Sequence, residues 1–209
     1  GVRVVSPMVV QGAAKGLLSV GRKMGSEDFT DENLLFVDAL SSTAISALEN
    51  ERLFQEELEK KRLERELELA LEIQKNLLPK STPKVDGYDI SGISIPSLLV
   101  GGDYFDFVPL PRNRILIAIA DVSGKGMPAA LLMANVQAAL RVLAPLDITL
   151  TEFVEKINSI VYQNTSADKF VTFFCGVLDA ESGEYCYVNA GHNPPLHVSA
   201  NLEVSQLTE

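Results

Sequence analysis

Two aspartates are the best candidates for chemistry in this sequence: Asp103 in GGDYFDF and Asp121 in ADVSGKGMPAALLMA. They lie in or directly beside two segments with strand character. Residues 98–110 alternate and are rich in aromatic and β-branched side chains, and residues 115–119 are a short apolar run. The segment PLPRN between them is typical of a turn. If this turn centres near Arg112, Asp103 lies directly across from Asp121.

Facing carboxylates at Asp103 and Asp121 are unfavourable without a cation. Opposed positions on one face of an antiparallel pair have Cβ atoms about 5 Å apart, and like charges there destabilise the sheet. A lone Asp at a strand end is more often a turn former or a helix cap, but a facing pair favours a bound cation. Asp106 ranks below the pair, because it lies an odd number of positions from Asp103 and points to the other face of a regular strand.

The ligand types at this site predict a hard divalent cation. Carboxylates and a backbone carbonyl, with no His or Cys beside them, suit Mg²⁺ or Mn²⁺ and not zinc. The glycines after Asp121 let main-chain N–H groups approach an anion such as phosphate, and Lys125 is placed to help hold it. The GKG segment lacks the spacing and the following Ser or Thr of a nucleotide-binding loop. Ser123 has no recognisable His or Lys base, which disfavours a serine nucleophile.

Four motifs in this order carry a family resemblance: GGDYFDF, ADVSGKGMPAALLMA, FVTFFCGVLD and YVNAGHNPP. Together they resemble the bacterial PPM-type metal-dependent Ser/Thr protein phosphatases, similar to stage II sporulation protein E and the stress-response sigma-factor regulators. The match covers roughly Leu69 onward. It implies a two-metal centre whose activated water attacks a phosphoserine or phosphothreonine without a phosphoenzyme intermediate.

The resemblance also implies roles for individual residues. Asp103 resembles the first metal-associated aspartate, Asp121 the bridging aspartate, and Val122 the residue that offers its carbonyl to a metal. Asp103 and Asp121 are therefore the expected catalytic residues, with Mn²⁺ or Mg²⁺ as the cofactor, two ions in a complete site. In YVNAGHNPP, His192 and its two asparagine neighbours are expected mainly to shape a strand-ending turn, with a catalytic role as the alternative.

The elements that must position these residues indicate an α+β protein, with a layered α/β/β/α sandwich in residues 79–209. Besides the central hairpin, the patterns predict a first strand at 88–95, a helix at 129–143 behind Pro128, a helix from the capping box Thr149–Glu152 to about Gln163, and a hairpin of 170–178 with 185–188. In the first of these helices the expected inward residues are Leu131, Leu132, Val136 and Leu140.

The sequence pattern of residues 1–38 predicts that they form the end of a separate domain. Val2–Val10 and Ala14–Arg22 have strand character, with Gln11 and Gly12 at the turn. Two strands alone are not a stable domain. Together with the start of the following helix, this part resembles the C-terminal part of a GAF sensory domain, and no ligand is assigned to it.

A long helix follows, from about Asp31 with Thr30 as N-cap, and neither Gly nor Pro interrupts it before Pro79. Residues 39–78 predict a coiled-coil linker with a break near the Lys60–Lys61 pair. The positions with 4-3 spacing are Leu40, Ala44, Ala47, Glu51, Phe54 and Leu58, then Leu63, Leu67, Ala70, Gln74 and Leu77. Glu56–Lys60 and Glu57–Lys61 are expected surface pairs. A parallel homodimer that joins sensor to effector explains the length better than a solvated helix packed on its own chain.

The composition limits the partners. The chain is 46% hydrophobic and 22% charged with a net charge of -10, which is unfavourable for binding nucleic acid or an anionic membrane. Neither a signal peptide nor an apolar run of membrane-spanning length is present. Cys175 and Cys186 lie in apolar strand-like runs, so buried free thiols in a reducing cytoplasm are expected.

The resulting hypothesis is a cytoplasmic phosphatase that acts on a phosphorylated regulator such as an anti-anti-sigma protein, controlled by the sensory part through the helix. The alternative is a non-catalytic signalling and dimerisation module with an inert phosphatase-like half. The family pattern includes further acidic residues, in an Asp-Gly motif and a final Asp, that this sequence does not reach before Glu209. The chain by itself is therefore interpreted as a fragment that binds Mn²⁺ weakly, lacks activity and is strained or loosely ordered near residues 101–126.

Overall fold

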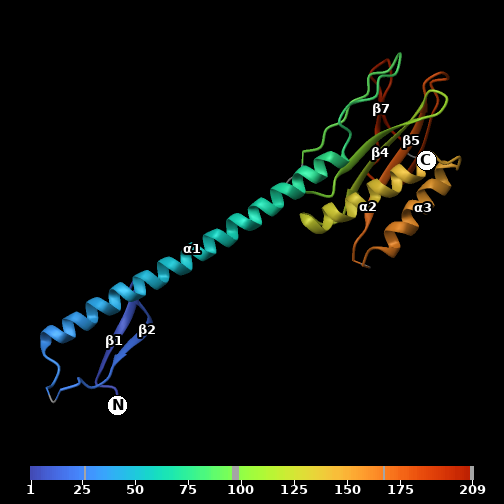
Figure 1. The fold of residues 1–209 in the computed structure, drawn as a ribbon. Helices are drawn as coiled ribbons and strands as arrows, with labels where there is room; N and C mark the ends of the chain where they lie inside the picture. The colour runs from blue at the N-terminus through green and yellow to red at the C-terminus, as the bar shows by residue number, and fades with distance from the viewer. Residues whose placement is uncertain (26, 96–98, 167, 208–209) are drawn as a thin grey trace. The chain divides into compact units, whose positions relative to one another are not determined.

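The computed structural model describes residues 1–25, 27–95, 99–166 and 168–207. The chain divides into two compact units, residues 1–65 and 66–209. Helix α1 (Asp31–Leu77) begins in the first unit and ends in the second (Figure 1). No helix in the described part of the chain combines the length and the apolar character that a bilayer crossing requires.

The first unit contains the predicted hairpin. Strands β1 (Val4–Val10) and β2 (Ala13–Val20) pair antiparallel. Gln11 and Gly12 form the turn with φ values of 48° and 81°, as a tight hairpin requires. The N-terminal half of α1 is anchored by three buried residues, Val37, Ser41 and Ile45, and Ser6 of β1 donates a hydrogen bond to Asp38.

Helix α1 begins as the sequence predicts. The Asn33 backbone N–H donates to Thr30 Oγ1 at 3.4 Å, and the Thr30 N–H donates to Asn33 Oδ1 at 3.2 Å, so Thr30 is the N-cap. The Glu57–Lys61 ion pair is present at 2.9 Å. The predicted Glu56–Lys60 pair is wrong, because Glu56 pairs with Arg52 and Lys60 lies 3.9 Å from Glu64. Both alternatives are equally spaced one turn apart on the helix surface, so spacing alone does not choose between them.

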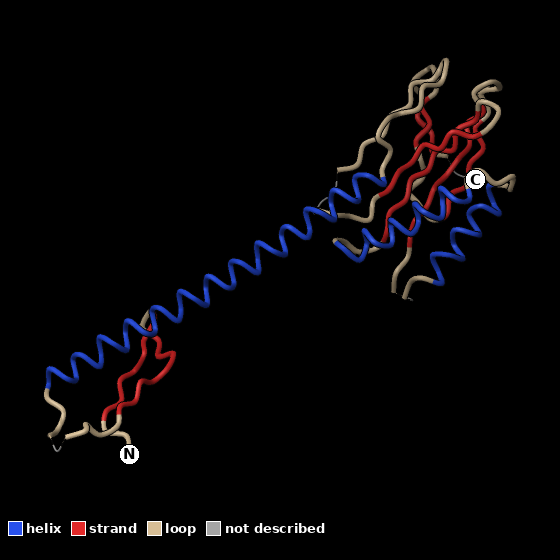
Figure 2. Tube along the Cα trace, viewed as in Figure 1, coloured by secondary structure: helices blue, strands red, loops and turns tan. Residues whose placement is uncertain are grey.

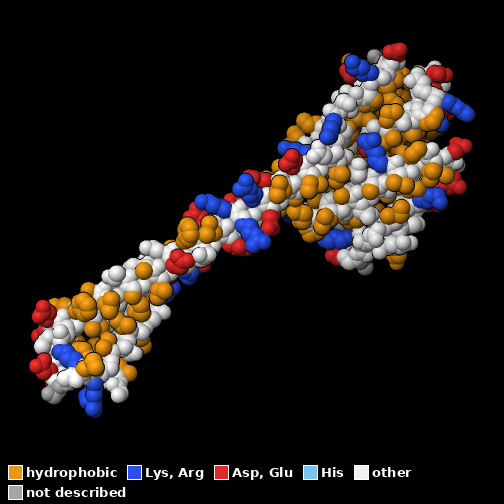
Figure 3. Space-filling model, viewed as in Figure 1, with side chains coloured by type: hydrophobic (Ala, Val, Ile, Leu, Met, Phe, Trp, Pro, Cys, Tyr) orange, Lys and Arg blue, Asp and Glu red, His pale blue; other side chains and the backbone are white. Residues whose placement is uncertain are grey.

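The positions of α1 with 4-3 spacing, which form the seam of the predicted coiled coil, lie in two different environments. Leu40, Phe54, Leu58 and Leu63 are about half exposed, at 46–56%. In the second unit Gln74 is buried and Leu77 packs against the core of its own domain. Figure 3 shows apolar side chains gathered on the visible surface of the first unit. The exposed apolar residues of this unit include Val5, Val9, Leu17, Leu35 and Phe36.

The second unit is built on a four-stranded antiparallel sheet in the order β3-β4-β5-β6 (Figure 2). The strands are β3 (Tyr104–Leu110), β4 (Arg114–Val122), β5 (Val171–Asp179) and β6 (Tyr185–Ala190), and a separate two-stranded sheet contains β7 (Leu196–Val198) and β8 (Val204–Gln206). The predicted hairpins are confirmed. The first residue expected in β3, Leu98, lies outside the described residues, and residues 99–103 precede the strand.

Helices α2 (Met127–Leu143) and α3 (Leu150–Gln163) cover one face of this sheet (Figures 1 and 2). The capping box at Thr149 and Glu152 is present, which confirms the predicted start of α3. The core between helices and sheet includes Tyr104, Leu116, Ala118, Ala120, Val122, Met133, Val136, Leu140, Phe153, Ile157, Phe173 and Cys175. Leu131 is 66% exposed, so its predicted inward position is wrong. It lies two positions, about 200°, from the buried Met133 on the helix.

On the other face of the sheet, one further prediction is wrong. Residues 88–95, all of them described, form no strand, and Tyr88 makes only an isolated bridge with Val85. Gly92 instead packs closely against the Phe105 side chain of the sheet, since a Cβ on Gly92 would be 2.5 Å from the Phe105 ring. The described residues therefore supply one helix layer and one four-stranded sheet of the expected sandwich, and the other sheet among the described residues of this unit has the two strands β7 and β8.

The cysteines are both free, as predicted, but only one is buried. Burial raises the pKa of the Cys175 thiol to about 12. Cys186 is exposed on β6, with its Sγ atom 3.8 Å from a carboxylate oxygen of Glu184.

Candidate active site

The register of β3 and β4 places Asp103 opposite Asp121. Tyr104 pairs with Ala120 and Leu110 pairs with Arg114, so the hairpin is centred on Arg112 as the sequence predicts. The turn is shorter than predicted, because β3 continues through Leu110 and only residues 111–113 connect the strands. Two turn residues have positive φ, Arg112 at 61° and Asn113 at 52°.

The two carboxylates meet at this end of the hairpin. Burial is the largest cause that raises the pKa of Asp103, and the charge of Asp121 and a hydrogen bond with it raise the pKa further. The charge of His192 acts in the opposite direction. Among the described residues, neither Asp103 nor Asp121 forms an ion pair with Lys or Arg. The protein thus brings two acids together without an ion pair to Lys or Arg among the described residues.

Thr172 and His192 also lie beside the Asp103–Asp121 pair. Thr172 lies across from Asp121 in the β4–β5 register, and its hydroxyl donates to the Asp121 carbonyl at 3.4 Å. The same hydroxyl lies 2.9 Å from His192 Nδ1. Thr172 was missed from the sequence, although counting the β4–β5 register from Asp121 finds it.

The NAGHNPP segment forms the predicted strand-ending turn. The His192 N–H donates to Asn189 Oδ1 at 2.8 Å, and Asn189 Nδ2 donates to the His192 carbonyl at 3.0 Å. Gly191 has φ of 77°, and Asn193 is exposed. The turn directs the His192 ring toward Thr172. The charge of His192 acts to lower the pKa of Asp103. The structural role expected for this segment is therefore present together with a place at the site.

A glycine opens space around the expected carbonyl ligand. A Cβ on Gly102 would lie 2.8 Å from the Val122 carbonyl oxygen and 2.8 Å from Val122 Cβ. Only glycine therefore fits beside Val122, whose side chain is buried in the helix-facing core. The second glycine of GGDYFDF is explained by this close approach.

The loop between β4 and α2 is pinned by Ser123. Its N–H donates to the Phe170 carbonyl and its hydroxyl accepts from the Phe170 N–H, both at 2.9 Å. This structural use agrees with the prediction that Ser123 is not a nucleophile. Lys125 is exposed in the loop. Lys169, which sequence reasoning missed, has its ammonium 3.5 Å from where a Cβ on Gly124 would lie and pairs with Asp168 at 3.6 Å.

Asp106 has a different role, as its lower rank predicts. Its carboxylate is fully buried and accepts from Tyr104 Oη at 2.5 Å, from the Phe107 N–H at 2.8 Å and from two nitrogens of Arg141 at 2.6 Å each. Burial, followed by the hydrogen bond and charge of Asp106, raises the pKa of Tyr104. The protein itself satisfies this carboxylate, so it is not available to a ligand.

Gln74, near the C-terminal end of α1, fixes the backbone just before Asp103. Gln74 is 8% exposed, its Nε2 donates to the Gly101 carbonyl at 2.6 Å, and the Gly101 N–H donates to its Oε1 at 3.1 Å. Both backbone groups of Gly101 are thereby fixed two residues before Asp103. The heptad pattern places Gln74 in a seam, whereas the structure uses it as a clamp on the chain.

The donor set fits a hard divalent cation. Asp103 and Asp121 would supply carboxylates, Val122 would supply the carbonyl that lies close to Gly102, and bound cations would remove the repulsion between the acids. Within the described residues, no group of three or more His, Cys, Asp or Glu side chains is placed to hold a metal ion. Each hard cation takes about six oxygen ligands, so this set is short for two ions unless water or further protein contributes.

Comparison with known proteins agrees with this chemistry. Residues 111–209 match the sequence profile of the stage II sporulation protein E family, SpoIIE. The phosphoserine phosphatase RsbU of Bacillus subtilis is 37% identical over 134 residues, which cover 64% of this chain and 40% of RsbU. Residues 111–209 belong to the SpoIIE family. This part of the chain is a SpoIIE-type PPM phosphatase domain, and the recognition made from the four motifs is confirmed.

Further relatives support the same assignment. The phosphoserine phosphatase RsbP of Bacillus subtilis is 29% identical over 137 residues, which cover 63% of this chain and 34% of RsbP. The chain therefore spans less than half the length of these two curated relatives. The SiaA-PP2C domain of Pseudomonas aeruginosa superposes with a TM-score of 0.55 at 19% identity, covering 71% of this chain and 61% of that domain. This likeness shows a PP2C-like fold with mixed helix and sheet.

Proposed function

We propose that this chain forms part of a Mn²⁺- or Mg²⁺-dependent protein phosphatase that hydrolyses phosphoserine or phosphothreonine on a regulatory protein. The contact between Asp103 and Asp121 carries the proposal, because it holds two acids together with no ion pair to Lys or Arg among the described residues. A SpoIIE-type domain and relatives named phosphoserine phosphatases support the same chemistry.

The side chains have distinct tasks in this proposal. Asp103, Asp121 and the Val122 carbonyl would hold the metal ions, with Asp103 as a ligand of one ion, Asp121 shared between two and the Val122 carbonyl as a ligand of one of them. Bound divalent cations supply a water of lowered pKa and neutralise charge on the phosphoryl oxygens. The Thr172 hydroxyl orients two groups, the backbone carbonyl of Asp121 and the ring of His192.

The loop after Asp121 suits the phosphoryl group. Gly124 and Gly126 have positive φ, at 99° and 73°, so the backbone turns sharply between the sheet and the N-terminus of α2. Lys125 within this loop and Lys169 beside it offer positive charge to phosphate oxygens. The expected substrate is a phosphorylated regulator such as an anti-anti-sigma factor, an inference from the family resemblance.

Helix α1 is proposed to carry regulation. It is one continuous helix from Asp31 to Leu77, and Gln74 near its end holds Gly101 next to the metal-binding Asp103. A change in the helix would therefore act on the site through this clamp. The proposed organisation is a C-terminal GAF part in residues 1–38, a linker in 39–78 and the phosphatase part in 79–209, in a cytoplasmic parallel homodimer. Exposed apolar positions such as Leu58 support the dimer.

The rival function is a signalling and dimerisation module whose phosphatase half is inert. Phosphate release from a phosphoserine protein separates the two hypotheses. It should be measured with and without Mn²⁺, on this chain and on a chain continued through the further acidic motifs of the family.

The phosphatase hypothesis predicts Mn²⁺-dependent release by the longer chain, little by the shorter one, and loss of activity in Asp103→Asn and Asp121→Asn. Asp86→Asn, at an exposed position outside the site, is the matched control and should retain activity. Release that is unaffected by both site variants would refute the metal assignment. No release from either chain would favour the inert module.

The dimer has its own test. Leu58→Lys should shift the protein to monomer in light scattering at tens of micromolar, because a buried charge in an apolar seam is strongly unfavourable. Glu59→Gln, one position around the helix, makes the same change in net charge without placing a charge in the seam and is the control. A monomeric parent protein would remove the coiled-coil proposal.

A further inference from the structure

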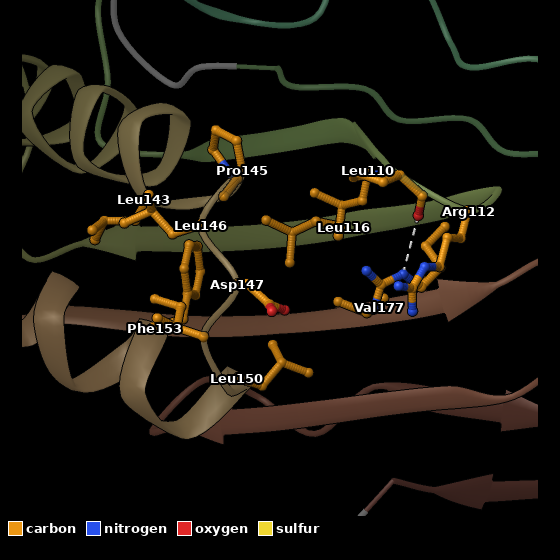
Figure 4. A pocket seen from close by; sticks show the side chains of 14 residues that line it. Leu110, Arg112, Leu116, Leu143, Pro145, Leu146, Asp147, Leu150, Phe153 and Val177 are labelled. Carbon is orange, nitrogen blue, oxygen red and sulfur yellow. Dashed lines mark hydrogen bonds between the residues drawn. The ribbon is translucent and has the colours of Figure 1, made fainter.

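A cavity of about 320 Å³ lies at the end of the second unit remote from the acid pair. It forms where α2 ends at Leu143 and α3 begins only at Leu150, so the connection between the helices, and not a helix, borders the end of the sheet (Figure 4). Arg114 at one end of β4 lines the cavity, whereas Asp121 is seven residues along the same strand. This separation is about 24 Å, so the cavity is distinct from the proposed metal site.

The floor of the cavity is apolar and well packed. Leu116, Leu143 and Phe153 line it and are 3%, 9% and 4% exposed. Leu110 and Leu150 extend the apolar lining from β3 and α3. A concave site with an apolar floor and a few polar groups is typical of small-molecule binding, and its volume lies at the lower end of the usual range of about 300–1,000 Å³.

The rim of the cavity is charged. Arg112 lies at one side, and Asp147 extends into the cavity from the α2–α3 connection (Figure 4). Arg114 also lines the cavity. Arg114 is partly engaged, because its Nε donates to the Pro111 carbonyl at 3.1 Å. The pKa of Asp179 is lowered chiefly by the backbone hydrogen bond from Ser182, and the charge of Arg114 adds to this effect. Arg112 forms no ion pair with any described residue.

Two guanidinium groups beside an apolar floor define the chemistry of a ligand. In a chain with a net charge of -10, most of the surface repels anions, whereas Arg112 and Arg114 attract them here. A guanidinium group offers fixed donors that match a carboxylate. Asp147 on the opposite side repels an anionic head group, so the head group is expected to lie toward the arginines.

We propose that this cavity binds a small amphipathic anion. The apolar body of the ligand packs on Leu116, Leu143 and Phe153, and its carboxylate accepts hydrogen bonds from Arg112 and Arg114. The inference does not depend on the phosphatase function, because none of these residues belongs to the metal or phosphate site.

Octanoate is a suitable probe, with octanol and octylammonium as controls that keep the apolar chain and remove or reverse the charge. Backbone amide NMR shifts of this chain during titration report both affinity and location. Octanoate is expected to bind with saturable shifts at residues 112–114 and 146–148. Octanol and octylammonium are expected to bind about tenfold more weakly or less, since they lack the charged hydrogen bonds.

Variants locate the head group. Arg112→Gln and Arg114→Gln should each weaken octanoate binding by about tenfold without changing the weak binding of octanol. Asp147→Asn should tighten octanoate binding severalfold by removing a repulsive charge. Arg22→Gln, an exposed position in the first unit, is the matched control and should bind as the parent does.

Three results would overturn the proposal. These are equal affinity for octanoate and octanol, octanoate shifts centred elsewhere in the chain, and an affinity unchanged in both arginine variants. Circular dichroism of each variant confirms that the fold is intact, since Arg112 and Arg114 lie at a surface turn. Failure of any of these tests leaves the Mn²⁺ assay of the acid pair unaffected.

Discussion

Asp106 and Asp103 lie three residues apart at one edge of the sheet and differ in what surrounds their charge. Asp106 is fully buried on the helix-facing side, where Arg141, Tyr104 and the Phe107 N–H satisfy it. Asp103 lies on the other side against Asp121, and this contact together with burial raises its pKa. The protein neutralises the first carboxylate itself and places the second beside a like charge, without an ion pair to Lys or Arg among the described residues.

The comparison shows that burial alone does not identify a functional acid. The more buried carboxylate is structural, because its partners are all supplied by the fold. The less buried one is the candidate for function, because the fold brings it to a like charge. Changes on the helix-facing side should therefore cost stability, whereas removal of a charge at the acid pair should increase it.

Loss of Arg141 has the largest expected effect. Arg141→Leu leaves the buried Asp106 charge without its cation, and breaking such a pair costs about 3 kcal/mol, at the low end because the guanidinium is 42% exposed. Urea unfolding measures the loss. The double variant Asp106→Asn with Arg141→Leu should recover part of it. A single variant as stable as the parent would show that Asp106 is not held as a charged pair.

Loss of the Gln74 clamp comes next. Gln74→Met keeps the length of the side chain but leaves both backbone groups of Gly101 unpaired, at an expected cost of about 2 kcal/mol in unfolding free energy. Mn²⁺ affinity should fall as well, since Gly101 positions Asp103. Gln55→Met on the exposed surface of α1 is the control and should change stability by less than about 0.5 kcal/mol. An unchanged Mn²⁺ affinity in Gln74→Met would disconnect α1 from the site.

Removal of one charge of the acid pair has a smaller effect of opposite sign. Asp103→Asn should raise the unfolding free energy by about 0.5–1 kcal/mol at neutral pH in a chelator, because it removes the repulsion from Asp121. Since the folded state raises the pKa of Asp103, the parent protein binds a proton more readily when folded and gains stability as the pH falls through that raised pKa. The advantage of the variant should therefore shrink on acidification. A destabilised variant at neutral pH would contradict the repulsion.

Local patterns predicted much of this structure. The symmetry of β3 and β4 about Arg112 gave the correct register, and the Thr149–Glu152 box gave the correct start of α3. These features depend on neighbours in the sequence. The strand expected at residues 88–95 was wrong because alternation does not reveal whether a partner strand exists, and Gly92 instead lies on the Phe105 ring.

Residues distant in the chain account for what was missed at the site. Thr172 lies opposite Asp121 but 51 positions later, and two helices separate them in the chain. Its role emerges only when β5 is paired with β4. Gln74 has the spacing of a coiled-coil seam, and its hydrogen bonds to Gly101 depend on how α1 packs on its own domain. Periodicity records which side of the helix is turned inward and does not say what lies there.

Mn²⁺ binding by this chain tests the assignment of Asp103 and Asp121 most directly. Calorimetric titration should show weak binding by the parent protein, no detectable binding by Asp103→Asn or Asp121→Asn, and unchanged binding by Asp86→Asn. The physical reason is that the site offers two carboxylates and one carbonyl, and loss of either acid removes a main ligand. Binding of Mn²⁺ by both site variants with the affinity of the parent would place the metal site elsewhere and contradict the account.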